Sequence, residues 1–300
     1  MKRPLSFLLL FLLLLTVACK QSKKEINSFV PVFSTYNSDS TNKTDRKLKD
    51  EIYYGILTPV EICTIFNRLG IPHKNDILNP LSNRDQYLSS SKTSINTGVY
   101  GVDFGYLKVF GVGQEVVDYM VTIRDLSEKL GIPDSYLSVP LRIIQNDMSK
   151  PDTILYLMNE AYNKIEGHLR EGGRESTAGL MVMGGWVEAM YIATQLAYNP
   201  EKPDPEVIQK IAEQKYTLTT LLSFLKNYYD DPMVVYYSKK LKYLNNYFDT
   251  FDIYFKKGDL EIDVARQVFR STGSEMNVTV ETLNKIRDYV YKMRTEMVTP

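Results

Sequence analysis

The segment from Glu175 to Tyr198, ESTAGLMVMGGWVEAMYIATQLAY, constrains the fold most, because it is apolar on nearly all sides. A helix on the surface of a protein carries one apolar stripe, whereas a helix that is apolar all round is buried among others. The segment 95–111, INTGVYGVDFGYLKVFG, has the same character. We therefore expect two central helices, at about 95–111 and 175–198, inside a larger bundle.

Both segments carry glycines, although each glycine in a helix interior costs about 1 kcal/mol relative to alanine. Small side chains along one line let another helix backbone come close, so tight helix packing is expected to offset that cost. Small residues of this kind also occur in membrane helices, but Glu188 and Gln195 interrupt the apolar run and argue against a membrane span. The small residues are Gly98, Gly101 and Gly105 in the first segment, and Gly185, Ala189, Ala193 and Ala197 in the second.

The rest of the chain shows the spacing of amphipathic helices. Thr58 to Glu61 form a capping box with proline at the first helical position, and the helix they open is expected to end at Gly70. Further helices are predicted from Asp204, from Asp231 through Phe255, and along a last apolar stripe. That stripe consists of Leu283, Ile286, Val290, Met293 and Met297.

No alternation of period two comparable to these stripes is found, and connections such as GDLE and NPEKPDP are short. Short connections join helices that lie antiparallel. The predicted fold class is therefore all-α, a multi-helix antiparallel bundle that occupies residues 51–300 as one helical domain.

The first 19 residues have the layout of a secretory signal: Lys2 and Arg3, an apolar run from Leu5 to Val17, and Ala18 before Cys19. The run is shorter than the roughly 20 residues of a membrane span. The order LTVAC resembles the lipobox of bacterial lipoproteins, although Thr16 stands where leucine is usual. The resemblance implies removal of residues 1–18 and lipidation of Cys19, which anchors the chain in a membrane. The alternative is a plain signal peptide that is cut at Ala18.

Residues 19–50 are rich in Ser, Asn, Thr, Lys and Asp, with one apolar patch, Phe29–Phe33, and are predicted to be a flexible tether. Asp39–Thr41 (DST) resembles an O-glycosylation motif of Bacteroidetes envelope proteins, with an unmodified linker as the alternative. Lys20 and Gln21 follow the cysteine, and the next charges are Lys23 and Lys24. The acidic pair that would resemble the surface-export signal of Bacteroidetes lipoproteins is therefore missing. We therefore expect an outer-membrane anchor with the body facing the periplasm.

The stretches TGVYGVDFGYLKVFG and GGWVEAMY together resemble a family of uncharacterised helical lipoproteins from Bacteroidetes, over roughly residues 50–300. The resemblance implies an envelope location and an all-helical body. It implies no activity and no site residues.

Charge and cysteine content exclude several classes of function. Without residues 1–18 the chain has 34 basic and 36 acidic residues, a balance that argues against a nucleic-acid partner. Cys63 is then the only cysteine besides Cys19, so no intramolecular disulfide is expected if Cys19 is lipidated. His73 and His168 have no companions at ligand spacing, and no phosphate or dinucleotide motif is found, so no metal and no cofactor are predicted.

Each central segment holds one acid, Asp103 and Glu188, and a buried acid needs partners or a shifted pKa. Gly184, Glu188, Tyr191 and Gln195 fall on one line of the second helix. One interpretation is a ligand pocket; the other is that these groups bond one another or a helix end, or face water. The candidate ligand-binding residues are Asp103 and Glu188 as acceptors, Gln195 on the same polar line as Glu188, and Trp186, Tyr191, Tyr100 and Tyr106 as aromatic walls.

Three functions stay open on this evidence. The leading hypothesis is a membrane-anchored envelope lipoprotein that acts as a non-catalytic binding or interaction module for a protein, small molecule or glycan. The alternative is a hydrolase, for example on glycans, that uses Asp103 and Glu188 as a carboxylate pair. The third is a structural envelope component. The 22 tyrosines are expected to pack at the boundary of the bundle, with a recognition surface, for example for a glycan, as the alternative.

Overall fold

The computed structural model describes Phe66 and residues 69–111, 113–146, 151–255, 260–263, 268–271 and 274–300. Several predictions fall outside these residues: the signal segment 1–18, lipidation of Cys19, the tether 19–50 with its Asp39–Thr41 motif, and the helix start at Thr58 with Cys63. Gly70, where that helix was expected to end, has a φ of 64°, the left-handed conformation common just beyond a helix end.

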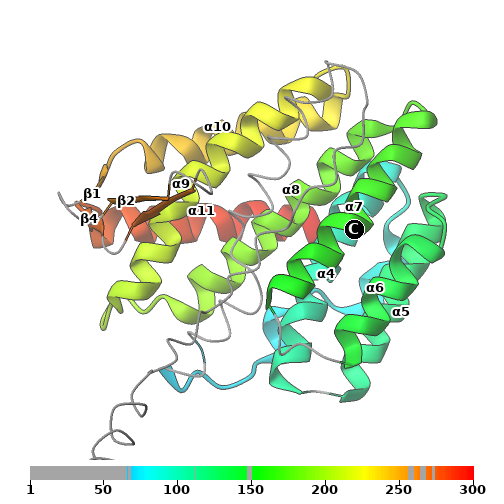
Figure 1. The fold of residues 1–300 in the computed structure, drawn as a ribbon, viewed down its shortest axis with the longest axis horizontal. Helices are drawn as coiled ribbons and strands as arrows, with labels where there is room; N and C mark the ends of the chain where they lie inside the picture. Colours follow the sequence, from blue (N-terminus) through cyan, green and yellow to red (C-terminus); the bar gives the residue numbers. More distant parts are fainter. Residues whose placement is uncertain are drawn as a thin grey trace, which may run out of the picture. The chain divides into compact units, whose positions relative to one another are not determined.

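The described residues form a helical bundle, which confirms the predicted all-α class (Figure 1). Short helical turns connect some of the helices: η1 (Asn75–Ile77), η2 (Leu81–Gln86), the π-helical turn η3 (Ala193–Ala197) and η4 (Lys226–Tyr228). The α-helices are α4 (Ser90–Phe110), α5 (Gly113–Lys129), α6 (Ser135–Asn146), α7 (Pro151–Glu171), α8 (Glu175–Ile192), α9 (Pro205–Leu225), α10 (Pro232–Phe248) and α11 (Val280–Val298).

The helix starts follow from capping residues. The side chain of Asp204 accepts hydrogen bonds from the second and third backbone N–H groups of α9, and Asp231 does the same for α10. In both helices proline occupies the first position, where a backbone N–H would have no partner within the helix, so its absence costs no hydrogen bond. Thr279 caps α11 through the N–H of Thr282. The predicted starts at Asp204 and Asp231 are confirmed.

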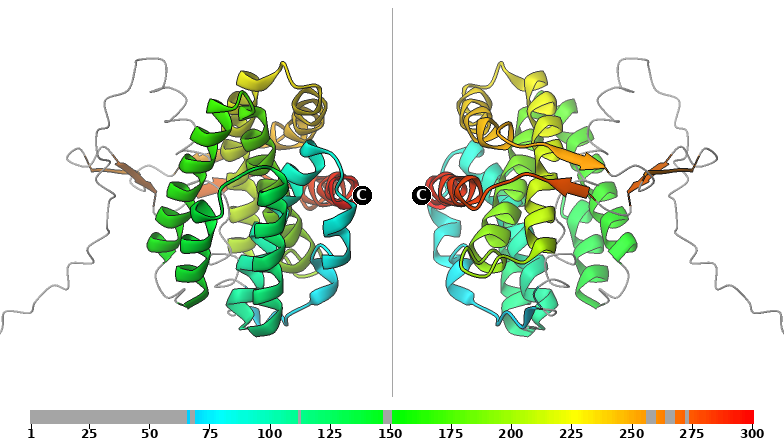
Figure 2. Two further views of the ribbon diagram at one scale, coloured as in Figure 1. Left: turned by 90° about the vertical axis from the view of Figure 1, so that its right-hand side faces the viewer. Right: turned by 90° about the vertical axis from the view of Figure 1, so that its left-hand side faces the viewer.

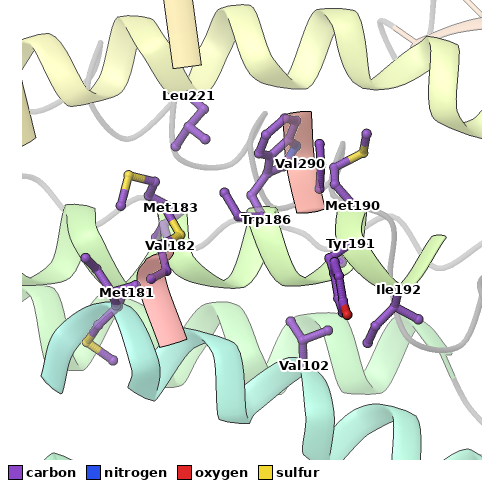
Figure 3. Packing of buried hydrophobic residues seen from close by; sticks show 14 of the residues in the cluster. Val102, Met181, Val182, Met183, Trp186, Met190, Tyr191, Ile192, Leu221 and Val290 are labelled. Atoms are coloured by element: carbon purple, nitrogen blue, oxygen red, sulfur yellow. The ribbon is translucent and has the colours of Figure 1, made fainter. Parts of the chain in front are cut away.

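Helix α8 forms the centre of the bundle, as its apolar sequence predicts. It packs against α4, α7, α9, α10 and α11, and nearly all of its residues from Thr177 onward are buried. Figure 3 shows Trp186 and Tyr191 on opposite sides of α8, with Trp186 turned toward Leu221 of α9. Helix α11 crosses the pair of α4 and α8 obliquely (Figure 1), and Figure 2 shows it nearly end-on.

Helices α4 and α8 make the most extensive contact in the bundle, and two glycines allow it. A Cβ atom on Gly98 would lie 2.0 Å from the carbonyl oxygen of Met181, and one on Gly184 would lie 2.1 Å from that of Ile95. Backbone therefore packs on backbone at this crossing. The prediction of tight packing is confirmed at Gly98, but on α8 the closest approach is at Gly184, one residue before the predicted line. Gly101 has open space around it.

The segment after α10 corrects the sequence analysis. The helix predicted to run through Phe255 ends at Phe248, and Phe255 belongs to a strand. Two antiparallel pairs follow, β1 (Ile253–Phe255) with β4 (Ser274–Met276) and β2 (Leu260–Asp263) with β3 (Val268–Ser271). GDLE is thus no short connection between helices. The missed signal is an alternation of period two, in which Leu260, Ile262 and Val264 are separated by acids.

Substitution of Gly98 by alanine tests the α4–α8 crossing. The new methyl group would overlap the backbone of Met181, which cannot move aside as a flexible side chain can. We expect the free energy of unfolding to fall by about 2–3 kcal/mol, a magnitude typical of overpacked cores. Gly101→Ala, in the same helix, is the matched control and is expected to stabilise by about 0.5–1 kcal/mol. Urea unfolding measures both, and equal effects of the two substitutions would contradict the proposed role of Gly98.

Candidate functional site

Three charged side chains from three helices meet inside the bundle: Asp103 of α4, Glu188 of α8 and Arg294 of α11. Asp103 and Glu188 are 0% exposed, and the side chain of Arg294 is 9% exposed. The α4–α8 crossing and the oblique course of α11 bring them together. A buried charge is tolerated only where it is paired and hydrogen-bonded, so their contacts decide what this cluster can do.

Arg294 and Glu188 form a two-pronged ion pair. Nε of Arg294 donates to Oε2 of Glu188 at 2.9 Å, and Nη2 donates to Oε1 at 2.9 Å. Nη2 also donates to the carbonyl oxygen of Ile77 at 3.1 Å, and the guanidinium lies 4.5 Å from the ring centre of Tyr191. Burial lowers the pKa of Arg294, but the charge and hydrogen bonds of Glu188 more than offset this, so Arg294 stays charged.

Asp103 lies beside this pair. Its Oδ2 accepts a hydrogen bond from the backbone N–H of Asn79 at 3.1 Å, whereas Oδ1 has no donor within reach among the described residues. Burial raises the pKa of Asp103 well above its ordinary value, and the negative charge of Glu188 raises it further. Arg294 and the Asn79 N–H lower that pKa, but less strongly.

Asn79, between η1 and η2, connects the acids to the rest of the polar interior and is itself fully buried. Its side-chain nitrogen donates to the hydroxyl of Tyr87 at 3.0 Å and to Oδ1 of Asn96 at 3.1 Å. Its backbone carbonyl oxygen accepts from the hydroxyl of Tyr119 at 2.9 Å, and its side-chain Oδ1 accepts from Nδ2 of Asn83 at 3.0 Å. Every polar group of Asn79 is therefore used, which fixes the loop that positions Asp103.

The C-terminal end of α11 is held by side chains from elsewhere. Carbonyl groups in the last turn of a helix lack partners within the helix. Here Lys92 donates to the carbonyl of Glu296 at 2.8 Å, Asn96 to that of Met297 at 3.0 Å, and Tyr87 to that of Val298 at 2.8 Å. The positive charge of Lys92 also suits the negative end of the helix dipole. These contacts fix α11 along its axis and so fix Arg294 against Glu188.

The predicted site residues separate into two groups in the structure. Asp103, Glu188, Tyr191 and Gln195 belong together: Tyr191 lies against Arg294, and the Gln195 side chain donates to the carbonyl of Arg287 at 3.2 Å. The predicted polar line of α8 thus faces α11. Gly184 does not belong to that polar face, because the backbone of Ile95 occupies the space beside it.

The predicted aromatic walls do not enclose one space. Trp186 donates to Gln214 of α9 at 3.2 Å, and Tyr106 accepts from the backbone N–H of Lys74 at 3.0 Å and packs edge-on against Phe66. Tyr100 donates to the carbonyl of Pro80 at 2.8 Å. The contacts therefore match the interpretation in which the acids and tyrosines bond to the protein itself. Ligand binding by these residues remains a prediction that the contacts do not favour.

Arg294 is the residue that the sequence analysis missed. It follows Met293 of the predicted apolar stripe, and it lies seven residues after Arg287, which faces the same line of α8. An arginine beside an apolar stripe usually extends to solvent. A signal was nevertheless available in the two acids themselves. Acids in apolar helices need a cation as a partner, and Arg294 lies within the most regular apolar stripe of the chain.

Within the described part of the chain, no group of three His, Cys, Asp or Glu side chains could hold a metal ion. No helix there combines the length and apolar character that a membrane span needs. No protein-family model, curated protein or solved structure matches this chain.

Asp103 and Glu188 lie close enough for the charge of Glu188 to act on Asp103, so the hydrolase alternative is not excluded by their separation. However, both are fully buried, and Glu188 is held by two hydrogen bonds from Arg294. A general acid or base must reach the atoms of its substrate. The observed arrangement instead holds three helices together, which weighs against the hydrolase alternative.

Substitution of Arg294 by methionine tests the ion pair. The substitution leaves Glu188 buried without its partner, so we expect the free energy of unfolding to fall by about 3–5 kcal/mol near neutral pH. Lys285→Met, on the same helix, removes the exposed ion pair with Glu281 and should leave the urea midpoint nearly unchanged. If both variants unfolded at the midpoint of the unmodified protein, Arg294 would not hold α11 in place.

Proposed function

We propose that this chain is a lipid-anchored protein of the bacterial cell envelope that binds a partner without catalysing a reaction. The observation that carries the non-catalytic part is the burial of Asp103 and Glu188, both 0% exposed and bonded within the protein. The strongest candidate acids of the chain thereby serve the fold. We therefore place the proposed binding function on the outer surface of the body.

The anchor part rests on the resemblance of residues 15–19 to a lipobox, and thus on Cys19. Lipid chains contribute about 0.8 kcal/mol for each buried CH₂ group, so a cysteine with several acyl chains would hold the body durably at a membrane. A body held in this way meets its partners by diffusion in two dimensions. An outer-membrane location facing the periplasm, inferred from Lys23 and Lys24, is part of the proposal.

The surface that supports binding is a cluster of tyrosines on α10 and α11, formed by Tyr243, Tyr247 and Tyr289. The ring centres of Tyr243 and Tyr289 lie 5.1 Å apart, those of Tyr243 and Tyr247 5.6 Å apart, and Tyr243 is 53% exposed. Tyrosine joins a large apolar face to a polar tip and is enriched at recognition surfaces. The cluster suits a protein or a glycan, two of the partner classes that the sequence left open.

Replacement of Cys19 by alanine tests the anchor. The substitution removes the thiol that lipidation requires, so we expect the protein to lose incorporation of labelled palmitate and to leave the membrane fraction of a bacterial host. Cys63→Ala is the matched control and should change neither result. Palmitate labelling and membrane fractionation measure both, and full membrane retention of the Cys19→Ala protein would contradict the proposed anchor.

A photo-reactive amino acid at position 243 tests the binding surface. The probe would lie in the exposed tyrosine cluster, so we expect a discrete cross-linked species in illuminated cells, and a weaker one after Tyr247→Ala. The control places the same probe at Val121 of α5, which is 39% exposed and distant in sequence from the cluster. Gel electrophoresis detects the products, and equal cross-linking at both positions would contradict a specific role for the cluster.

A further inference from the structure

The interior holds an imbalance of charge. Two carboxyl groups, Asp103 and Glu188, lie fully buried beside one guanidinium, that of Arg294. If both acids were ionised, the cluster would carry a net negative charge that no water could solvate. An uncompensated charge in a protein interior is among the most unfavourable arrangements known, and ionisable groups in that position neutralise instead.

We infer that Asp103 is a neutral carboxylic acid in the folded protein, that it donates its proton to Glu188, and that the pair presents one negative charge to Arg294. The proton comes from solvent during folding, since an aspartate in the unfolded chain is ionised near neutral pH. No bond other than this O–H is made or broken. The inference concerns the interior alone and does not depend on the proposed function.

The hydrogen-bond geometry favours the proton. An ionised carboxylate only accepts hydrogen bonds, so two ionised carboxylates cannot bond to each other. Oδ1 of Asp103 is buried and has no hydrogen-bond partner among the described residues, and the negative charge of Glu188 acts on the same carboxyl group. A hydroxyl at Oδ1 would turn this acceptor without a partner into a donor that can serve the neighbouring carboxylate.

The contacts also decide which acid holds the proton. Both oxygens of Glu188 accept hydrogen bonds from Arg294, at 2.9 Å each, and that charge-assisted contact keeps the negative charge on Glu188. Asp103 accepts one hydrogen bond, from a neutral backbone N–H. The raised pKa of Asp103, caused first by burial and then by the charge of Glu188, agrees with this assignment.

Six other ionisable groups lie near Asp103, and four of them are tyrosines. They come from every element packed around it, and burial raises the pKa of each tyrosine above its ordinary value of 10. All of these hydroxyls are therefore neutral from mild acid to mild alkali. The groups are Glu188 and Tyr191 from α8, Arg294 from α11, Tyr119 from α5, Tyr100 from α4 itself, and Tyr87 after η2.

The proton makes Asp103 a reserve partner for Arg294. While Glu188 is present, Asp103 stays neutral. Burial still raises the pKa of Asp103 if Glu188 loses its charge, but the repulsion that raises it further disappears, while the attraction of Arg294 remains. Asp103 then releases its proton and supplies the negative charge. The interior thus keeps one negative charge opposite one positive charge in either case.

Stability should depend on pH in a defined direction. The folded state binds one more proton than the unfolded state at this site, so stability falls as pH rises above the ordinary aspartate pKa and continues to fall up to the raised folded pKa of Asp103. Within that window the unfolding constant rises about tenfold for each pH unit from this site alone. Asp103→Asn keeps the shape and the donor to Glu188 but binds no proton, so it removes this dependence.

The first experiment compares urea unfolding of the purified full-length protein and its Asp103→Asn variant between about pH 5 and pH 7. The ratio of their unfolding constants cancels the titration of all other groups. We expect the unmodified protein to lose stability relative to the variant by about tenfold per pH unit. A ratio that stays constant, or that changes in the opposite direction, would overturn the inference.

The second experiment reverses the role of Asp103. Near pH 7, Asp103→Asn is expected to stabilise the unmodified protein but to destabilise the Glu188→Gln protein at least tenfold, because Arg294 then has no counter-charge. The same sign in both backgrounds would overturn the reserve role.

Infrared spectra near neutral pH give a readout independent of stability. A C=O band of a protonated carboxylic acid should be present in the unmodified protein and lost in Asp103→Asn. Its absence from the unmodified protein would overturn the neutral state.

Discussion

The contact between Arg294 and Glu188 is the interaction on which the rest of the interior depends. It joins α11 to the central helix α8, and the same guanidinium binds the carbonyl of Ile77 and so holds the loop that carries Asn79. A buried ion pair is weak evidence for stability, since the loss of hydration can exceed the attraction. What this ion pair contributes is a fixed position of α11 against α8. An apolar α11 could rotate or slide against α8, whereas two parallel hydrogen bonds at 2.9 Å admit one register.

The close approach of α4 and α8 places a second acid beside that contact. Gly98 and Gly184 remove the side chains that would keep the two backbones apart, and the approach brings Asp103 against Glu188. Each glycine costs free energy in its helix, and both the apolar packing and the polar cluster that the close crossing allows offset that cost. A wider crossing would let water reach the acids, and both carboxylates could then ionise without Arg294.

The sequence predicts the elements well and their contacts poorly, for a physical reason. Periodicity and capping residues act within one helix, so the stripe on α11 and the starts at Asp204 and Asp231 are confirmed. The meeting of Asp103, Glu188 and Arg294 depends on how three helices cross, which no local signal encodes. Arg294 looks like a solvated charge until α8 is placed beside it. The strands after α10 were missed because their alternation of apolar and polar residues is short. It directly follows a long stripe with helical spacing, which the prediction extended through Phe255.

The interior cluster also extends to the surface. Tyr191 lies against Arg294 on one side, and its ring centre is 6.1 Å from that of Tyr291, which is half exposed. Tyr289, two residues earlier on α11, belongs to the tyrosine cluster and donates to the carbonyl of Lys240 on α10 at 3.1 Å. The register that the ion pair imposes on α11 therefore also sets where Tyr289 stands relative to Tyr243. A binding surface built on two helices needs such a fixed register, because tyrosine rings a few ångströms out of place no longer form one surface.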